Sequence, residues 1–253
     1  MGSTQSITVL YRRKLIFLAL SVGALILGTS CVSGANARLT GDRTPIALVS
    51  LVANGDITWS GEGPVDAARL VASQRRTLER DSDLAVNVRS AELIDSAEAI
   101  FREVLETSLL IFLADPEDYL HTEAYEGAQL HRGHIREERA SPEGYRMINP
   151  RDRDFPLALE RETGIGRVMF VEFELSKAMS SGIGRTGQLR AQVDMTVDVL
   201  DATGRSLFRR RLSVQSSGSI RVASGIYSSS ELIILFEDAI YDISYYFLDI
   251  IAP

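Results

Sequence analysis

A strict alternation of apolar and polar residues between Leu189 and Val199 constrains the fold more than any other feature of the sequence. Its apolar positions are Leu189, Ala191, Val193, Met195, Val197 and Val199. Because successive side chains of a β-strand point to opposite faces, the pattern predicts a strand with one buried and one wet face, as antiparallel sheets have. Residues 201–204 (Asp-Ala-Thr-Gly) then predict a tight turn, and Leu207–Val214 is expected to return as the partner strand.

Other segments are predicted to widen this sheet. Ile46–Ala53 is a nearly continuous apolar run, which favours a strand buried on both faces, and Val168–Leu175 is predicted as a second apolar strand. Residues 54–56 (Asn-Gly-Asp) indicate a turn, after which Ile57–Trp59 is expected to continue the sheet. The residues Leu84–Val88 predict one more short strand.

A long helix is predicted from about Ala91 to Ala114. Its apolar stripe, with residues three or four apart, consists of Ile94, Ala97, Phe101, Leu105, Ser108 and Phe112. Pro116 is expected to end this helix, because a proline disfavours helical geometry in the residue before it. Val65–Leu78 carries a less complete stripe that predicts another helix.

A short helix and a terminal helix complete the predicted elements. Asp154 is expected to cap the short helix, which runs through Glu162 and which Gly164 ends. Ser228 and Glu231 form a capping box at the start of the terminal helix. Its core face is predicted to contain Leu232, Leu235, Phe236, Ala239, Ile243, Phe247 and Ile250.

Together these elements predict an α+β fold, in which a mixed, largely antiparallel sheet is packed with a long central helix and a C-terminal amphipathic helix. We expect a single domain of this kind over residues 45–253. Residues 115–155 are charged, irregular and rich in turn signals. They predict a long insertion, which within a compact domain is usually functional or mobile.

The first thirty residues differ from everything that follows. Residues 12–14 (Arg-Arg-Lys) form a positive cluster, and no acidic residue precedes Asp42. The uncharged stretch Leu15–Ser30 follows, and its most apolar part, Leu15–Leu27, is 13 residues long. A membrane-spanning helix needs about 20 apolar residues, so this segment is too short for a permanent span. A basic region followed by a short apolar region predicts a secretory signal peptide.

Cys31, the only cysteine of the chain, stands directly after that segment. The residues before it resemble a relaxed lipobox of the kind found in spirochaete lipoproteins: Leu27, Gly28, Thr29 and Ser30. The leucine lies one position further from the cysteine than in the commonest pattern. The resemblance implies removal of residues 1–30, a Cys31 that carries fatty-acyl chains such as palmitate, and a flexible tether over residues 31–44. The alternatives are a chance thiol or an uncleaved N-terminal anchor.

The net charge of the chain indicates which classes of partner it can bind. The net charge is −7 at pH 7, and removal of residues 1–30, which contain three basic and no acidic residues, makes it −10. A domain with this negative charge repels nucleic acid. The expected partners are therefore the membrane, through the lipid anchor, and an envelope protein. Val32 stands where sorted lipoproteins often carry an aspartate that signals inner-membrane retention, which favours the outer membrane without indicating which side of it.

The order of elements also resembles that of periplasmic lipoprotein domains of the curli-secretion-channel and penicillin-binding-protein-activator type. The shared features are the early strand Ile46–Ala53, a short helix that leads through residues 164–166 into Val168–Leu175, the hairpin Val193–Phe208, and the amphipathic last helix. The resemblance covers most of residues 45–250 and implies an α+β lipoprotein domain. Residues 115–155 have no obvious counterpart in it.

All three histidines lie in that insertion. His131 and His134 have a spacing that can chelate a metal, and His121 or Glu123 could complete a set of three or four ligands. Gly133 disfavours a regular helix that presents both imidazoles, and the spacing is not that of a recognised zinc signature. The competing interpretation is a polar loop whose histidines face water.

No motif predicts catalysis. Residues 182–187 (Gly-Ile-Gly-Arg-Thr-Gly) match the dinucleotide-binding pattern, but a strand rather than a helix is expected to follow, so a hairpin loop is the better interpretation. The sequence lacks a P-loop, a nucleophile elbow and a HExxH motif. Glu172 and Glu174 share one face of a predicted strand and are interpreted as its wet face. We therefore expect no enzyme and no resident cofactor.

The leading hypothesis is a non-catalytic, lipid-anchored envelope protein that binds another protein or helps an envelope assembly. An alternative is a lipid- or small-ligand-binding lipoprotein, suggested by the aromatic residues of the last helix: Tyr241, Tyr245, Tyr246 and Phe247. These aromatics would line a pocket on that hypothesis and belong to the core on the competing one. The third hypothesis is a metal-dependent enzyme that uses the histidines between residues 121 and 134.

Overall fold

The structure is a computed structural model that describes residues 39, 44–60, 78, 81–108, 110–131 and 138–252. Cys31, its lipobox and nearly all of the predicted helix Val65–Leu78 lie outside the described residues. The strands are β1 (Ala47–Asn54), β2 (Thr58–Trp59), β3 (Leu84–Ala85), β4 (Arg139–Ala140), β5 (Arg167–Ile183), β6 (Thr186–Asp201), β7 (Ser206–Gln215), β8 (Ile220–Val222) and β9 (Tyr227–Ser228). The helices are α4 (Ile94–Thr107), α5 (Glu123–Gly127), α6 (Asp154–Thr163) and α7 (Ser229–Ile251), with short 3₁₀ turns at η1 (Ser90–Glu92) and η2 (Pro116–Asp118).

One sheet dominates the structure, with strand order β4-β1-β5-β6-β7. In addition β2 pairs with β5, and β8 pairs with β6. The β1–β5 pair is parallel, whereas β5, β6 and β7 follow one another antiparallel. Helices pack on this mixed sheet, so the predicted α+β fold is confirmed. None of the helices in the described ranges is both long and apolar enough to cross a membrane.

The β5–β6 hairpin is the longest pairing in the sheet. Its register runs from Arg167 opposite Asp201 to Ile183 opposite Thr186, with one irregularity between Met179 and Ser181. Burial along β6 alternates as the sequence predicts. The glycine-rich residues 182–187 form the tip of this hairpin, which confirms the hairpin interpretation and gives a phosphate no helix N-terminus to meet.

A bend after β1 lets the chain continue along β5 as β2. The side chain of Asn54 replaces a piece of backbone pairing here: its Oδ1 accepts from the Leu175 amide at 2.7 Å, and its Nδ2 donates to the Leu175 carbonyl at 3.0 Å. The next residue is Gly55, whose amide donates to the Glu138 carbonyl at 2.6 Å. A Cβ on Gly55 would lie 2.5 Å from that carbonyl oxygen, so only glycine permits this approach.

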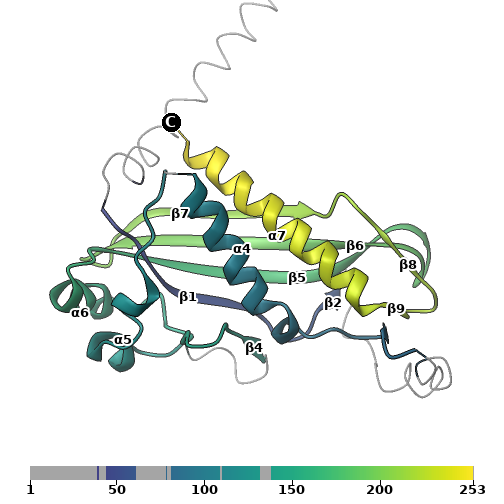
Figure 1. The fold of residues 1–253 in the computed structure, drawn as a ribbon, viewed down its shortest axis with the longest axis horizontal. Helices are drawn as coiled ribbons and strands as arrows, with labels where there is room; N and C mark the ends of the chain where they lie inside the picture. The colour runs from purple at the N-terminus through teal and green to yellow at the C-terminus, as the bar shows by residue number, and fades with distance from the viewer. Residues whose placement is uncertain are drawn as a thin grey trace, which may run out of the picture.

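Helices α4 and α7 lie side by side over one face of the sheet (Figure 1). Their aromatic contacts with the sheet are close: the ring centroids of Phe101 and Phe173 are 6.4 Å apart, and those of Phe208 and Phe247 are 5.6 Å apart. The predicted core face of α7 is buried, with Ile250 only partly so. The capping interaction is also present, since Ser228 Oγ accepts from the Glu231 amide at 3.1 Å.

The central helix is shorter than predicted at both ends. It ends at Thr107, with Ser108 as its C-cap, and Phe112 is 36% exposed instead of belonging to the buried stripe. The reason is a competing backbone pairing. The Ile46 amide donates to the Phe112 carbonyl at 2.8 Å, and the Ala114 amide donates to the Ile46 carbonyl at 2.9 Å. Residues near 112–114 therefore run beside the start of β1, and a helix could not make those bonds.

The other face of the sheet is covered at one end by α5 and α6, where a second apolar cluster includes Tyr119, Tyr125, Phe155 and Phe170. The predicted cap of α6 was wrong by two residues. Asp152 Oδ1, rather than Asp154, accepts from the amides at the start of the helix. Gly164 ends α6 as predicted, with a φ of 77° that favours glycine.

We expect Phe247→Ala to lower the free energy of unfolding by about 3–5 kcal/mol, because Phe247 is fully buried between α4 and the sheet and its removal leaves a cavity. Tyr246→Ala is the matched control, because its side chain is 47% exposed and its loss should cost at most about 0.5 kcal/mol. Urea unfolding of both variants measures the difference. Equal losses would mean that α7 does not pack as described.

Candidate functional site

The face of β5, β6 and β7 opposite α4 and α7 is lined by polar side chains, and we call it the open face. It consists of Glu172 and Glu174 on β5, Asp194, Thr196 and Asp198 on β6, and Arg209 and Arg211 on β7. Alternation places these residues together, because their neighbours Val171, Phe173, Met195 and Val197 point into the core under the helices. The interpretation of Glu172 and Glu174 as a wet strand face is confirmed.

Charges on the open face are arranged by strand, with acids in the middle and arginines along β7. Arg211 Nη2 lies 2.6 Å from Glu174 Oε2 and 3.2 Å from Asp194 Oδ2. Arg209 Nε lies 3.9 Å from Asp198 Oδ2. The two arginine side chains are still 63% and 71% exposed, so these pairs contribute little to stability and leave charge available to a partner.

A pocket opens where the open face meets the segment that follows α5. Its cavity volume is about 80 Å³, and it is open to solvent. Its lining comprises Ser50, Val52, His131, Arg139, Met147, Ile148, Pro150, Phe170, Val171, Glu172, Thr196, Asp198 and Arg209. Phe170 and Ile148 give it an apolar floor, and Arg139 and Glu172 pair across its side at 2.5 Å. An apolar floor with charges of both signs suits a polar ligand or a protein side chain.

Sequence reasoning placed Glu172 on a wet strand face, and the alternation along β6 implies the same for Asp198, but neither could be placed beside Arg139 or Phe170. The alternation along β5 and β6 was a usable signal for the carboxylates. The approach of β4 and of residues 146–150 depends on long-range pairing, such as Ala53 opposite Ala140 and Leu130 opposite Ile148. The sequence pattern within a single element does not predict contacts between residues so far apart in the chain.

The predicted metal ligands are only partly described. His121 and Glu123 are exposed at the start of α5, and the Glu123 amide donates to Glu162 Oε1 at 3.0 Å. His131, which follows α5 in the chain, is exposed and lines the pocket. His134 lies outside the described residues. Within the described part of the chain, no three His, Cys, Asp or Glu side chains form a group that could hold a metal ion. Metal binding by the full set stays a prediction.

The aromatic residues of the last helix do not behave as one group. Phe247 is buried in the core, but Tyr241, Tyr245 and Tyr246 are 41–47% exposed on the outer face of α7. The expectation that these tyrosines either line a pocket or belong to the core was wrong. Both alternatives assumed that the helix is enclosed on all sides, whereas α7 packs on the sheet and on α4 and leaves one side open.

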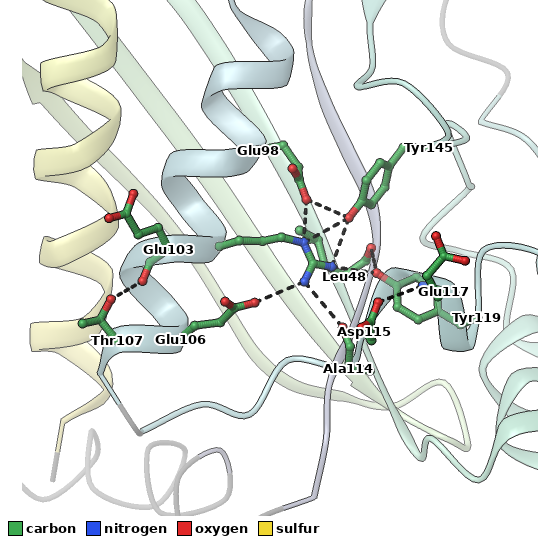
Figure 2. A network of polar contacts seen from close by, with 11 residues as sticks. Leu48, Glu98, Glu103, Glu106, Thr107, Ala114, Asp115, Glu117, Tyr119 and Tyr145 are labelled. Carbon is green, nitrogen blue, oxygen red and sulfur yellow. Dashed lines mark hydrogen bonds and ion pairs between the residues drawn. The ribbon is translucent and has the colours of Figure 1, made fainter.

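Arg102 of α4 belongs to a network of polar contacts that includes Glu98, Tyr119 and Tyr145 (Figure 2). The Arg102 guanidinium donates to Glu98 Oε1 at 2.5 Å and to the hydroxyls of Tyr119 and Tyr145, each at 3.1 Å. It also reaches the Ala114 carbonyl at 3.5 Å. The Arg102 and Glu98 side chains are only 12% and 17% exposed. One buried cation therefore joins α4, residues 114–119 and Tyr145.

Two buried tyrosines extend this network to β1. The Tyr119 hydroxyl donates to the Leu48 carbonyl at 2.9 Å, and the Tyr125 hydroxyl donates to the Val49 carbonyl at 3.1 Å. The Tyr125 oxygen in turn accepts from the Arg146 amide at 2.8 Å. Burial raises the pKa of Tyr119 and raises that of Tyr125 to about 12, so both stay neutral donors at physiological pH.

We expect Arg102→Met to lower the free energy of unfolding by about 3–5 kcal/mol, because it leaves the buried Glu98 carboxylate without its cation. Arg205→Met is the matched control: its ion pair with Asp201 is exposed, and its loss should cost about 1 kcal/mol or less. Chemical denaturation measures both. A loss no larger for Arg102 than for Arg205 would contradict the role of the network.

A second buried cation lies on the helix-covered side of the sheet. The Lys177 residue is 2% exposed, and its Nζ donates to the Tyr227 hydroxyl at 3.0 Å. The same nitrogen lies 5.4 Å from the centre of the Trp59 ring. Burial lowers the pKa of Lys177 to about 8; Arg185 lowers it further, and Asp56 opposes the shift. Two aromatic rings thus stabilise a charge that burial disfavours.

The pKa of Lys177 predicts how stability depends on pH. Since the folded-state pKa is lowered from 10.5 to about 8, the unfolded chain binds more protons between those values, and stability rises with pH there. We expect the wild type to gain about 2 kcal/mol relative to Lys177→Met between about pH 7 and about pH 9.5. Urea unfolding at several pH values measures this difference. Parallel pH profiles for the two proteins would refute it.

Comparisons with known proteins leave the family open. No family model matches the sequence, and no curated protein matches it. Among solved structures, the C-terminal domain of LpoB from Salmonella enterica is similar at 10% sequence identity and a TM-score of 0.24. The match covers 72% of this chain and 93% of that one. At that TM-score the likeness carries no argument, so the function has to come from this chain's own residues.

Proposed function

We propose that the chain is a non-catalytic lipoprotein of the bacterial envelope whose α+β domain binds another protein. The observation that carries the proposal is the open face. The sheet is covered along one side by α4 and α7, but on the other side α5 and α6 cover only one end (Figure 1). Within the described part of the chain, the rest of this face presents carboxylates on β5 and β6 beside guanidiniums on β7, and such charges favour specificity in a protein interface more than raw affinity.

The attachment part of the proposal rests on the sequence. A basic cluster, a short apolar stretch and a lone cysteine after small residues support a lipid on Cys31 and removal of residues 1–30. Of residues 31–44, those before Leu39 would then serve as a tether, because Leu39 itself is buried in the apolar core. Val32 supports placement at the outer membrane, through the resemblance to sorted lipoproteins.

A second candidate function is the binding of a small polar ligand in the pocket beside Arg139 and Phe170. The pocket has an apolar floor, and charged residues of both signs line it. This arrangement supports a ligand with both an apolar part and charged groups. Native mass spectrometry of the purified protein separates the candidates, because a bound small molecule would add a small defined mass and a bound protein would add a much larger one.

Lipid attachment is tested by metabolic labelling with an alkyne-tagged fatty acid. We expect label on the wild type, and we expect Cys31→Ala to lose it and to accumulate as the larger, unprocessed precursor, because Cys31 is the only cysteine available for acylation. Membrane fractionation of the same cells shows where each form resides. Equal label in both proteins would refute the anchor and leave an uncleaved N-terminal segment as the explanation.

Protein binding through the open face is tested in cells with a photo-cross-linking amino acid. Placed at Gln215, which is exposed on the open face of β7, it should give a discrete cross-linked band. Placed at Asp238, which is exposed on the outer face of α7, it should not give that band. The same pattern at both positions, or no band at Gln215, would contradict the assignment of the open face as the interface.

A further inference from the structure

Among the described residues, no strand pairs with the outer edge of β7 in the main sheet. Strand β7 is the last strand in the order β4-β1-β5-β6-β7, and it is ten residues long, from Ser206 to Gln215. The opposite edge is β4, which has only two residues. Figure 1 shows β7 at the margin of the sheet, with α7 crossing one of its faces. Long free edges are uncommon, because their unpaired backbone groups can recruit another strand.

The backbone groups that point outward from β7 can be assigned. One residue past the strand, the Ser216 amide donates to the Ala191 carbonyl at 2.9 Å, so these two residues form a hydrogen-bonded pair. Such pairs alternate along antiparallel strands. In the register of β6 and β7, Arg210 and Leu212 therefore bond to β6. The N–H and C=O groups of Arg209, Arg211 and Ser213 are directed away from the sheet.

The same three residues carry their side chains on the open face. Arg209 and Arg211 flank this edge with guanidiniums that are 71% and 63% exposed. On the other face of β7, Phe208 and Leu212 are buried beneath α7, and the exposed Arg210 lies between them. A strand added to β7 would thus meet two arginines on the open face, and a third arginine flanked by apolar side chains on the other.

We propose that an acidic, extended segment of a partner protein adds to β7 as a further strand of the sheet, with carboxylates at every second position opposite Arg209 and Arg211. This rests on the proposed protein-binding function and specifies how the partner is recognised. Main-chain bonds to the outward groups supply affinity, and the alternating charges supply selectivity. The apolar positions of the segment extend the surface of Phe208 and Leu212.

A second copy of this chain fits the edge poorly. In the two antiparallel two-fold pairings that overlap most of β7, centred on Arg210 or on Arg211, an arginine of one copy faces an arginine of the other. Like charges directly opposite each other destabilise a strand pair. The arginines therefore disfavour these two pairings, and the same charge selects a partner with acidic residues.

The test measures binding of a fluorescent peptide, Thr-Glu-Val-Glu-Val-Glu-Thr, to the purified full chain by anisotropy. A scrambled peptide, Glu-Glu-Glu-Val-Val-Thr-Thr, has the same charge but no alternation. We expect the alternating peptide to bind at least about tenfold tighter than the scrambled one, and added salt to weaken its binding. Equal binding of the two peptides, or no binding of either, would overturn the proposal.

Ser213→Pro isolates the backbone contribution. Proline removes an outward N–H that β6 does not use, and edge strands tolerate proline at such positions. We expect this variant to bind the alternating peptide about tenfold more weakly or worse, while Ser213→Ala, which keeps the N–H, binds within about twofold of the wild type. Circular dichroism checks that both variants are folded. Unchanged binding by Ser213→Pro would overturn strand addition.

Arg209→Glu keeps the proposal testable if the proline variant fails to fold. It should weaken binding of the alternating peptide by about tenfold or more, whereas Arg161→Glu, a reversal at an exposed residue of α6, should not. Equal effects of the two reversals would overturn the proposal. Light scattering completes the test: a dimer of the wild type that Ser213→Pro dissolves would assign the edge to a second copy instead.

The outcomes separate this proposal from the proposed function. A cross-link at Gln215 without selective peptide binding would leave a protein-binding open face and reject strand addition. Selective peptide binding without any cross-linked partner in cells would leave the edge intact and reject the cellular function.

Discussion

The antiparallel pairing of β5 with β6 is the interaction on which the rest of the structure depends. Strands β1 and β2 pair with β5, and β7 and β8 pair with β6. Helix α7 packs on β6 and β7, and α4 packs on α7. Alternation along β6 therefore determines both faces of the sheet. Its apolar side chains pack under the helices, and its polar side chains form the centre of the open face. A change in the β5–β6 register would alter the core and the open face together.

The parts of the fold that the sequence predicted correctly are those governed by local periodicity. The hairpin with its turn at residues 201–204, the buried strand β1 and the core face of α7 all follow from spacings within one element. The length of the central helix was wrong because a distant group competed with a local preference. Helix α4 stops early because residues near Phe112 pair with Ile46 instead.

The start of α7 shows the same limit in another way. Ser228 caps the helix as the local motif predicts, but Asp83 also accepts bonds there, from the Ser230 amide and from the hydroxyls of Ser228 and Ser229. These hydrogen bonds lower the pKa of Asp83 to about 2. Nothing around Asp83 in the sequence indicates a partner some 145 residues away. For the candidate site, likewise, local patterns marked the charged strand faces, but only long-range pairing places Arg139 and the wall of the pocket beside them.

The position of β1 has a mechanical consequence. A pull on the chain before Leu39 first loads that residue, which is buried in the apolar core, and then the start of β1. Strand β1 pairs with β5 over most of its length, so a force along the strand loads these hydrogen bonds together in shear. Peeling them open one at a time would need a force across the strand. A domain tethered at its N-terminus would therefore receive tension at a strand that is paired along most of its length. Strand β7, which is furthest from β4 in the sheet order, would not be pulled directly.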